Sequence, residues 1–128
     1  MTEVTWIDSD LVTLIHDQQL AEHGGAEGLR DAALLFSALG RPKNQLAYGS
    51  ADIIDPAAKY TTRIVQNHPF VDGNKRTGFV TGVLFLELNG YNFKASEEDA
   101  AQAVLELAAG TISEAGFREF LRANVEPV

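Results

Sequence analysis

The sequence contains no cysteine, no long apolar run and no excess of basic residues. Without cysteine the chain forms neither disulfides nor thiolate metal sites. The longest apolar region, residues 79–88, is too short to span a bilayer, and the N-terminus MTEVTWIDSD lacks the pattern of a secretory signal. The formal net charge of −8 disfavours binding to nucleic acid and anionic membranes. We therefore expect a cytoplasmic protein without direct nucleic-acid or membrane partners, in which any phosphate must meet a local cluster of cations.

Cap and turn residues divide the 128 residues into about six helical segments. Asp8, Ser9 or Asp10 can cap the first, Asp55 precedes Pro56 at the start of the third, and Ser96 and Ser113 can cap the last two. No sustained period-two alternation is present. We predict an all-α fold, a single domain over residues 1–128. The expected helical segments are 8–25, 29–42, 55–67, 73–89, 96–110 and 113–125.

The fourth segment is apolar around most of its circumference, which predicts a helix buried in the middle of the bundle. The second segment is expected to stop at Gly40 and Pro42. This leaves Arg41 to Asp55 as a long loop, a feature that is often functional. Tyr48, within it, is a candidate contact to a substrate.

The stretch NHPFVDGNKRTGF, residues 67–79, places titratable groups around a glycine directly before the central helix. The first turn of a helix has unpaired N–H groups and the positive end of the helix dipole, which together suit an anion. Gly73 can adopt a positive φ and lets an anion approach the backbone. Lys75 and Arg76 stand where cations oppose the dipole, and such a conflict with stability indicates a functional site. We predict that they bind phosphate.

Two further residues complete the parts needed for phosphoryl or nucleotidyl transfer. Asp72 is a suitable ligand for Mg²⁺, which commonly takes one or two carboxylates together with water and phosphate. Histidine side chains in general titrate near neutral pH, so a residue of the type of His68 can accept a proton from an attacking hydroxyl. Each residue also has an ordinary interpretation: Asp72 as a helix cap, His68 as a hydrogen-bonded loop residue, and the two cations as a solvated face.

The remaining residues of interest receive structural roles or none. Phe70 is expected to anchor the loop in the core. His16 and His23 have no comparable neighbours in the sequence, and we assign them no function.

The run HPFVDGNKRTG resembles the signature of the Fic/Doc family, in the form found in its Doc (death-on-curing) branch. The resemblance continues more loosely through LIHDQQLAEHGG and LFLELNGYNF. It implies that His68 activates a target hydroxyl, that Asp72 holds Mg²⁺, and that Lys75 and Arg76 stabilise the transferring phosphate of ATP. It also implies that Gly73 and Asn74 supply backbone and amide donors to the nucleotide.

Two positions depart from the Fic branch of the family. Lys75 stands where that branch has its second glycine, and Phe79 where it has a final arginine. Both changes count against AMP transfer. The resemblance to Doc implies instead a kinase that phosphorylates a threonine of elongation factor Tu and so inhibits translation.

The family resemblance also implies regulation by a partner. We find no run of the inhibitory-helix type (Ser/Thr)-x-x-x-Glu-(Gly/Asn). A Doc-like toxin is restrained by an antitoxin whose disordered segment folds into a groove on binding. Three alternatives remain: an AMP-transferase on the same scaffold, a non-catalytic helical module that binds a protein, and a helix-turn-helix DNA binder, which the net charge of −8 disfavours.

Overall fold

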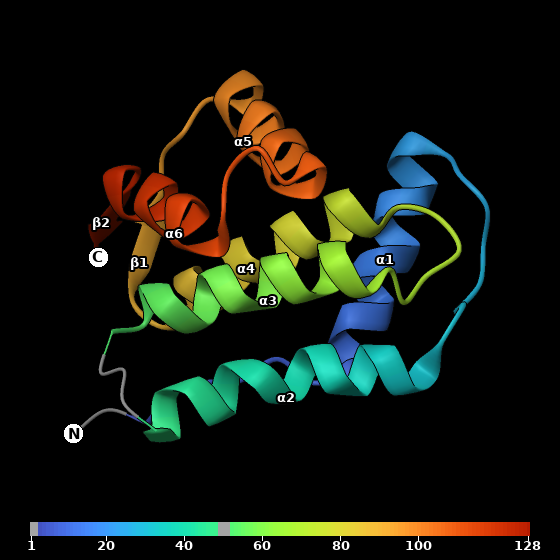
Figure 1. Ribbon diagram of the computed structural model, residues 1–128, viewed down its shortest axis with the longest axis horizontal. Helices are drawn as coiled ribbons and strands as arrows, with labels where there is room; N and C mark the ends of the chain where they lie inside the picture. Colours follow the sequence, from blue (N-terminus) through green and yellow to red (C-terminus); the bar gives the residue numbers. More distant parts are fainter. Residues whose placement is uncertain (1–2, 49–51) are drawn as a thin grey trace.

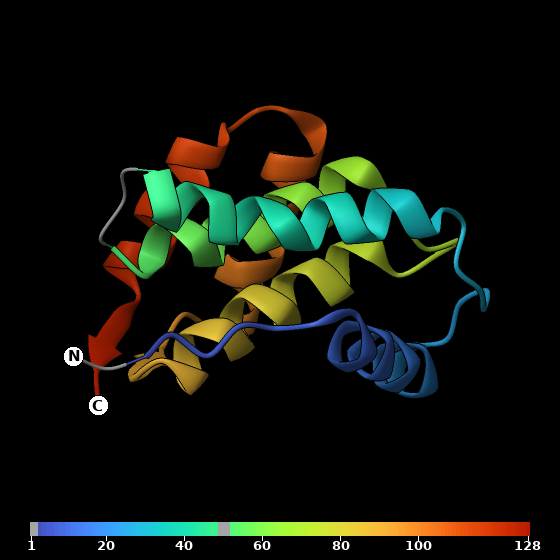
Figure 2. The same cartoon turned by 90° about the horizontal axis from the view of Figure 1, so that it is seen from below.

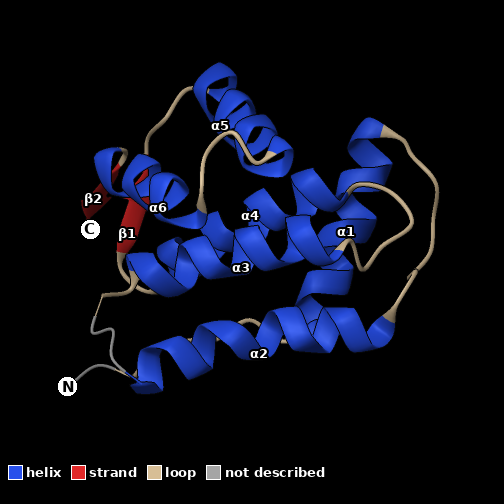
Figure 3. Ribbon diagram, viewed as in Figure 1, coloured by secondary structure: helices blue, strands red, loops and turns tan. Residues whose placement is uncertain are grey.

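The computed structural model describes residues 3–48 and 52–128, and it leaves the side chains of residues 45–48 undescribed. Within these residues the fold is helical apart from one two-stranded antiparallel sheet, in which Asn92 pairs with Glu126 (Figures 1 and 3). This confirms the predicted all-α class, to which the short sheet is an addition. The elements are α1 (Ser9–His23), α2 (Ala32–Tyr48), α3 (Ile54–Asn67), α4 (Asn74–Leu88), β1 (Tyr91–Phe93), α5 (Glu97–Ala109), α6 (Glu114–Ala123) and β2 (Val125–Pro127).

Three of the predicted caps are confirmed by side-chain bonds to the first turn. Asp8 accepts from Leu11 N–H at 2.9 Å, and Ser96 and Ser113 cap α5 and α6. The cap predicted for α3 is wrong. Asp55 lies inside the first turn of that helix. The prediction failed because a proline fits any position of a first turn, where its missing N–H costs nothing.

The predicted end of the second helix is also wrong. Helix α2 continues through Gly40 and Pro42 to Tyr48, so most of the expected loop Arg41–Asp55 is helical. Pro42 is buried, and Ala38 on the preceding turn has no exposed surface. Burial of this face outweighs the backbone hydrogen bond that the proline removes. The proposed substrate contact, the side chain of Tyr48, lies outside the described residues.

Helices α3 and α4 lie side by side in the centre of the molecule, with α2 on one side and α5 and α6 on the other (Figures 1 and 2). The face of α4 toward α3 is made largely of small residues, with Phe85 packed on Tyr60 farther along the helix. Thr77, Gly78, Thr81 and Gly82 are buried there, and the Thr61 hydroxyl donates to the carbonyl of Gly78 at 2.8 Å. The opposite face of α4, which we expected to be buried as well, is only partly covered. The central helix is therefore buried on one side and lines grooves on the other.

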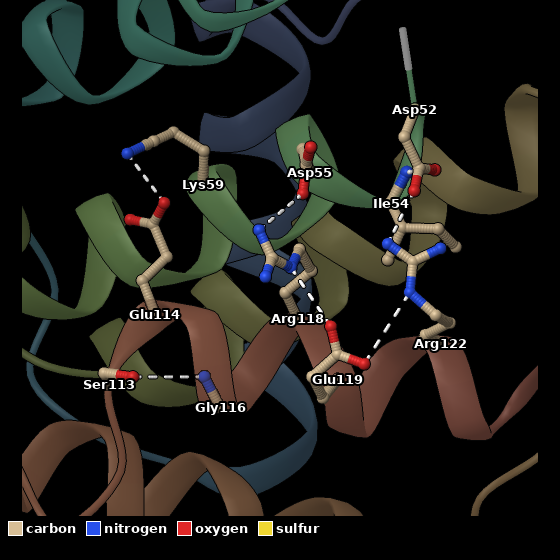
Figure 4. A network of polar contacts seen from close by, with 10 residues as sticks. All are labelled: Asp52, Ile54, Asp55, Lys59, Ser113, Glu114, Gly116, Arg118, Glu119 and Arg122. Carbon is tan, nitrogen blue, oxygen red and sulfur yellow. Dashed lines mark hydrogen bonds and ion pairs between the residues drawn. The ribbon is translucent and has the colours of Figure 1, made fainter. Parts of the chain in front are cut away.

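A row of ion pairs holds α6 along α3 (Figure 4). Lys59 pairs with Glu114 at 2.6 Å, and Arg118 contacts Asp55 at 3.2 Å. Because α5 is joined to α6 by a short turn, these pairs also help to keep α5 beside the first half of α4.

Among the described residues, no helix has both the length and the apolar content to cross a membrane.

Candidate active site

The site begins at Gly73, the residue before α4. Gly73 has φ of +79° and ψ of +15°, a left-handed conformation that glycine adopts without strain. The first backbone bond of the helix runs from Thr77 N–H to Gly73 O at 3.0 Å. The N–H groups of Asn74, Lys75 and Arg76 precede that bond and have no acceptor within the helix. These N–H groups lie at the positive end of the helix dipole.

A cavity of about 600 Å³ opens at this helix end, in the size range of small-molecule sites. Its polar wall comes from the loop between α3 and α4 and from the first turn of α4. Its apolar wall comes mainly from α5. The structure thus brings the predicted residues His68, Asp72, Gly73, Asn74, Lys75 and Arg76 to one cavity, whose other lining residues are Val65, Phe79, Glu97, Ala100, Ala101, Val104, Leu105 and Ala108.

Asp72 is one of the residues that line this cavity, and its carboxylate is anionic. Its two oxygens accept from the backbone N–H of Ala26 at 3.2 Å and of Gly73 at 2.8 Å. These bonds, the Ala26 bond first, lower the pKa of Asp72 below its ordinary value, and the positive charge of Arg76 lowers it further. The interpretation of Asp72 as the helix cap is wrong, because Gly73 occupies the cap position and, in the part of the chain that the structure describes, no side chain caps α4.

The donor set suits Mg²⁺ held jointly with a nucleotide. Among the described residues there is no group of three or more His, Asp or Glu side chains that could hold a metal by themselves. Asp72 offers one ionised carboxylate on the cavity wall, and Mg²⁺ commonly completes such a ligand with water and phosphate oxygens.

Asn74 serves the loop through its side chain. The amide is buried and bonds to the backbone of Phe70 twice, accepting from Phe70 N–H at 3.0 Å and donating to Phe70 O at 2.9 Å. Phe70 itself is 2% exposed. Because the Asn74 side chain is used in this way, its backbone N–H is the group that remains as a donor to a ligand.

Sequence reasoning missed His16, which lies directly behind the motif loop. Its ring is buried and stacks on Phe70 with centroids 3.8 Å apart and planes inclined by 8°. Its Nε2 lies 2.7 Å from Asp72 O. Because a carbonyl only accepts, Nε2 carries the hydrogen of this bond. The available signal was its spacing: His16 shares an inward helical face with Val12, Ile15 and Gln19, all of them buried.

The segment between α1 and α2, residues 24–31, was also missed, and it lies along the motif loop (Figure 1). Val71 N–H donates to Gly28 O at 3.0 Å, and Arg76 donates to Gly24 O at 3.2 Å. Gly25 has φ of +126°, and a Cβ there would lie 2.8 Å from the nearer Asp72 carboxylate oxygen. Only glycine fits this approach. The site therefore depends on a second segment about 45 residues upstream.

A protein-family model described as the Fic/DOC family matches residues 6–86. The chain belongs to the Fic/DOC family. Among curated proteins, this family member is 30% identical to "Protein kinase doc" of Escherichia phage P1 over 117 residues, 91% of this chain and 92% of that protein. It is 37% identical to "Toxin Doc" of Mycolicibacterium smegmatis over 75 residues, 56% of this chain and 57% of that protein. The predicted resemblance to Doc is confirmed.

A solved structure supports the fold of this family member. It is the N-terminal Fic domain of a putative cell filamentation protein, a VirB-translocated Bep effector protein from Bartonella quintana, with bound ADP. The TM-score is 0.50 at 16% identity, and the match covers 82% of this chain and 53% of that one. At this identity the likeness concerns the fold alone.

Proposed function

We propose that this Doc-like protein is the toxin of a toxin–antitoxin pair and a kinase that transfers the γ-phosphate of ATP to a threonine of elongation factor Tu in the cytoplasm. The observation that carries the proposal is the single cavity lined by His68, the Asp72 carboxylate and the first turn of α4. The similarity to the phage P1 protein, which is named a kinase, supports the reaction type. We name elongation factor Tu as the substrate because the resemblance of the motif to the Doc branch implies it.

Each part of the cavity has a task in this reaction. The free N–H groups at the start of α4, with Lys75 and Arg76, hold the nucleotide phosphates. His68 accepts the proton of the threonine hydroxyl as its oxygen attacks the γ-phosphorus and the bond to the β-phosphate oxygen breaks, which releases ADP. Asp72 would hold Mg²⁺, and the bound ion would neutralise part of the negative charge of the phosphates.

Transfer of AMP on the same scaffold is the competing activity. Lys75 projects a side chain at the helix end, where the Fic branch of the family has a glycine, and Phe79 lines the cavity in place of an arginine. Phe79 packs against Phe93 with ring centroids 5.6 Å apart, so it forms a wall and offers no phosphate contact. These two residues favour transfer of the terminal phosphate.

Labelled ATP tests the proposal. The purified protein is incubated with elongation factor Tu, Mg²⁺ and ATP labelled on either the α- or the γ-phosphate, beside a His68→Ala control. We expect label on a threonine from γ-labelled ATP only, and none with His68→Ala. Label from the α-phosphate would show AMP transfer, and equal labelling by His68→Ala would show that His68 is not the base.

Expression of the protein in cells tests the non-catalytic alternative. Growth inhibition that survives His68→Ala would favour the non-catalytic module.

A groove between α1 and α4 is our candidate for the antitoxin. It is apolar, with a volume of about 290 Å³, and it includes Leu14, whose side chain is 64% exposed. A disordered segment that folds on binding gains most from such a surface, since its apolar face would be buried there. The groove is lined by Leu11, Leu14, Ile15, Gln18, Phe79, Val80, Val83, Leu84 and Glu87.

Co-expression with the antitoxin separates this role from catalysis. Leu14→Asp should keep the toxicity of the protein and lose its neutralisation by the antitoxin. Phe36→Asp is the matched control, because Phe36 is 62% exposed on α2, away from the groove. Neutralisation of Leu14→Asp to the same degree as the control would place the antitoxin elsewhere.

A further inference from the structure

Arg30 holds three successive carbonyl groups where α3 ends. Its Nε donates to His68 O at 2.7 Å and its Nη2 to Asn67 O at 2.9 Å. Its backbone N–H donates to Pro69 O at 2.7 Å. Arg30 comes from the segment between α1 and α2, 38 residues before His68. Arg30 thus ties the last turn of α3 to the start of the motif loop, and the neighbouring Asp31 N–H adds a second bond to Pro69 O at 3.0 Å.

His68 needs such a restraint because of its backbone conformation. It ends α3 with φ of +53° and ψ of +53°, and among the described residues no other side-chain-bearing residue has a positive φ. A Cβ makes this left-handed conformation less stable than the helical or extended one. Strain of this kind persists only where surrounding contacts impose it, and it is concentrated at functional sites.

The guanidinium suits this position for a second reason. Carbonyls at the end of a helix lack partners within the helix and carry the negative end of its dipole. The planar fork of arginine donates from two atoms at once and bears a positive charge, so it satisfies two successive carbonyls together. A lysine would keep the charge and reach one of them. Arg30 is exposed, so little packing depends on it.

We propose that Arg30 is a positioning residue that holds His68 in its left-handed conformation and so directs the imidazole into the cavity. His68 lines the cavity and Arg30 does not. The proposal rests on the proposed function for what His68 does there. The orientation of His68, the proposed base, would then depend on Arg30, a residue outside the motif.

The first experiment measures the conformation of His68 directly, by the three-bond H–N–Cα–H coupling and the Cα and Cβ chemical shifts in nuclear magnetic resonance spectra. We expect the left-handed signature in the unmodified protein, its loss in Arg30→Ala, and an intermediate state in Arg30→Lys. Arg41→Ala is the control, since Arg41 is an exposed arginine on α2. An unchanged His68 signal in Arg30→Ala would overturn the proposal. Should Arg30→Ala fail to fold, the comparison of Arg30→Lys with Arg41→Ala decides the same question.

The second experiment measures phosphate transfer by the same variants. Displacement of a catalytic group by about 1 Å can reduce a rate about 100-fold, so we expect kcat of Arg30→Ala to fall by about that factor. The KM for ATP should be unchanged, because Arg30 does not reach the phosphate site, and Arg30→Lys should recover part of kcat. A normal kcat in Arg30→Ala would overturn the proposal. Failure of the unmodified protein to transfer phosphate would refute the proposed function instead, and the His68 spectra would still decide whether Arg30 holds the residue.

Discussion

At the scale of single residues, His16 offers a test of how the motif loop is held. Phenylalanine at this position would keep the ring stacked on Phe70 and remove the donor to Asp72 O. An unpaired carbonyl costs about 1–3 kcal/mol when it is buried. Because Asp72 O is only partly buried, His16→Phe should lose stability by the lower part of that range and bind ATP more weakly, because the turn at Gly73 relaxes. Urea unfolding and the KM for ATP measure the two effects.

His16→Gln is the matched variant. The glutamine amide reaches about as far as Nε2 and donates a similar hydrogen bond, while the stacking is lost. We expect it to keep a KM closer to that of the unmodified protein than His16→Phe does. Equal KM values for His16→Phe and the unmodified protein would mean that the hydrogen bond to Asp72 does not hold the site.

The same residues show what the sequence could predict about the site. The types and spacing of His68, Asp72, Lys75 and Arg76 were sufficient to place them at one helix end, because a helix start fixes the local geometry. Their partners were not predictable. Asp72 bonds to Ala26, which is 46 positions away, and such contacts depend on the tertiary path of the chain. Local pattern contains no information about that path.

At the scale of elements, the close packing of α3 on α4 depends on Gly78 and Gly82 of α4. An added Cβ at Gly82 would lie 2.9 Å from Ala57 O and in still closer contact with the Thr61 hydroxyl. Gly82→Ala should therefore push the helices apart and destabilise the protein by about 1–3 kcal/mol, although alanine favours a helix. Gly40→Ala in α2 is the control, since a Cβ there meets no atom of the described residues within 4 Å, and it should stabilise by about 0.5–1 kcal/mol. Denaturant unfolding that gave both variants the same sign would contradict this packing.

Element boundaries were predictable where a local signal decides them. The end of α1 at Gly24 and the start of α4 after Gly73 follow from glycine conformations that no neighbour needs to impose. The extension of α2 past Pro42 was not predictable, because it results from burial against the rest of the bundle. The same holds for α4. Hydropathy indicated burial of its large side chains, which is right for Phe85 and Leu86, but it did not indicate that close helix packing also buries Thr77, Gly78 and Gly82.

At the scale of the whole molecule, the stability at alkaline pH should depend on Tyr60. Its hydroxyl lies in the core and accepts from Ile7 N–H at 3.0 Å, which ties the N-terminal segment to α3. Burial raises the pKa of Tyr60 from 10.0 to about 12. A raised pKa in the folded state gives stability that is complete below pH 10 and is lost as the pH rises toward 12.

Comparison with Tyr60→Phe isolates this effect from other titrations. Below pH 10 the variant should be less stable by about 1–3 kcal/mol, since Ile7 N–H loses its partner. Its deficit should shrink by about 1.4 kcal/mol per pH unit above 10. The free energy of unfolding of both proteins at about pH 8 and about pH 11 provides the test. A deficit that does not change with pH would show that the phenol ionises in the folded state as readily as in the unfolded state.

The charge distribution of the whole molecule leads to the last prediction. The chain has a net charge of −8, yet it places Lys75 and Arg76 at the positive end of the α4 dipole, on the wall of one cavity. Without ligand, Lys75→Ala should raise stability by about 0.3–1 kcal/mol, because it relieves an unfavourable placement. With Mg²⁺ and ATP the unmodified protein should become the more stable of the two, since a ligand stabilises the state that binds it.

The rise in Tm on addition of Mg²⁺ and ATP measures this effect. Lys75 is the cleaner probe, because Arg76 also donates to Gly24 O. We expect a rise in Tm for the unmodified protein and for His68→Ala, and a much smaller rise for Lys75→Ala, with Mg²⁺ alone as the control. An equal rise in Lys75→Ala would mean that the phosphates bind elsewhere, and the cations would then be a cost to stability with no ligand to explain it.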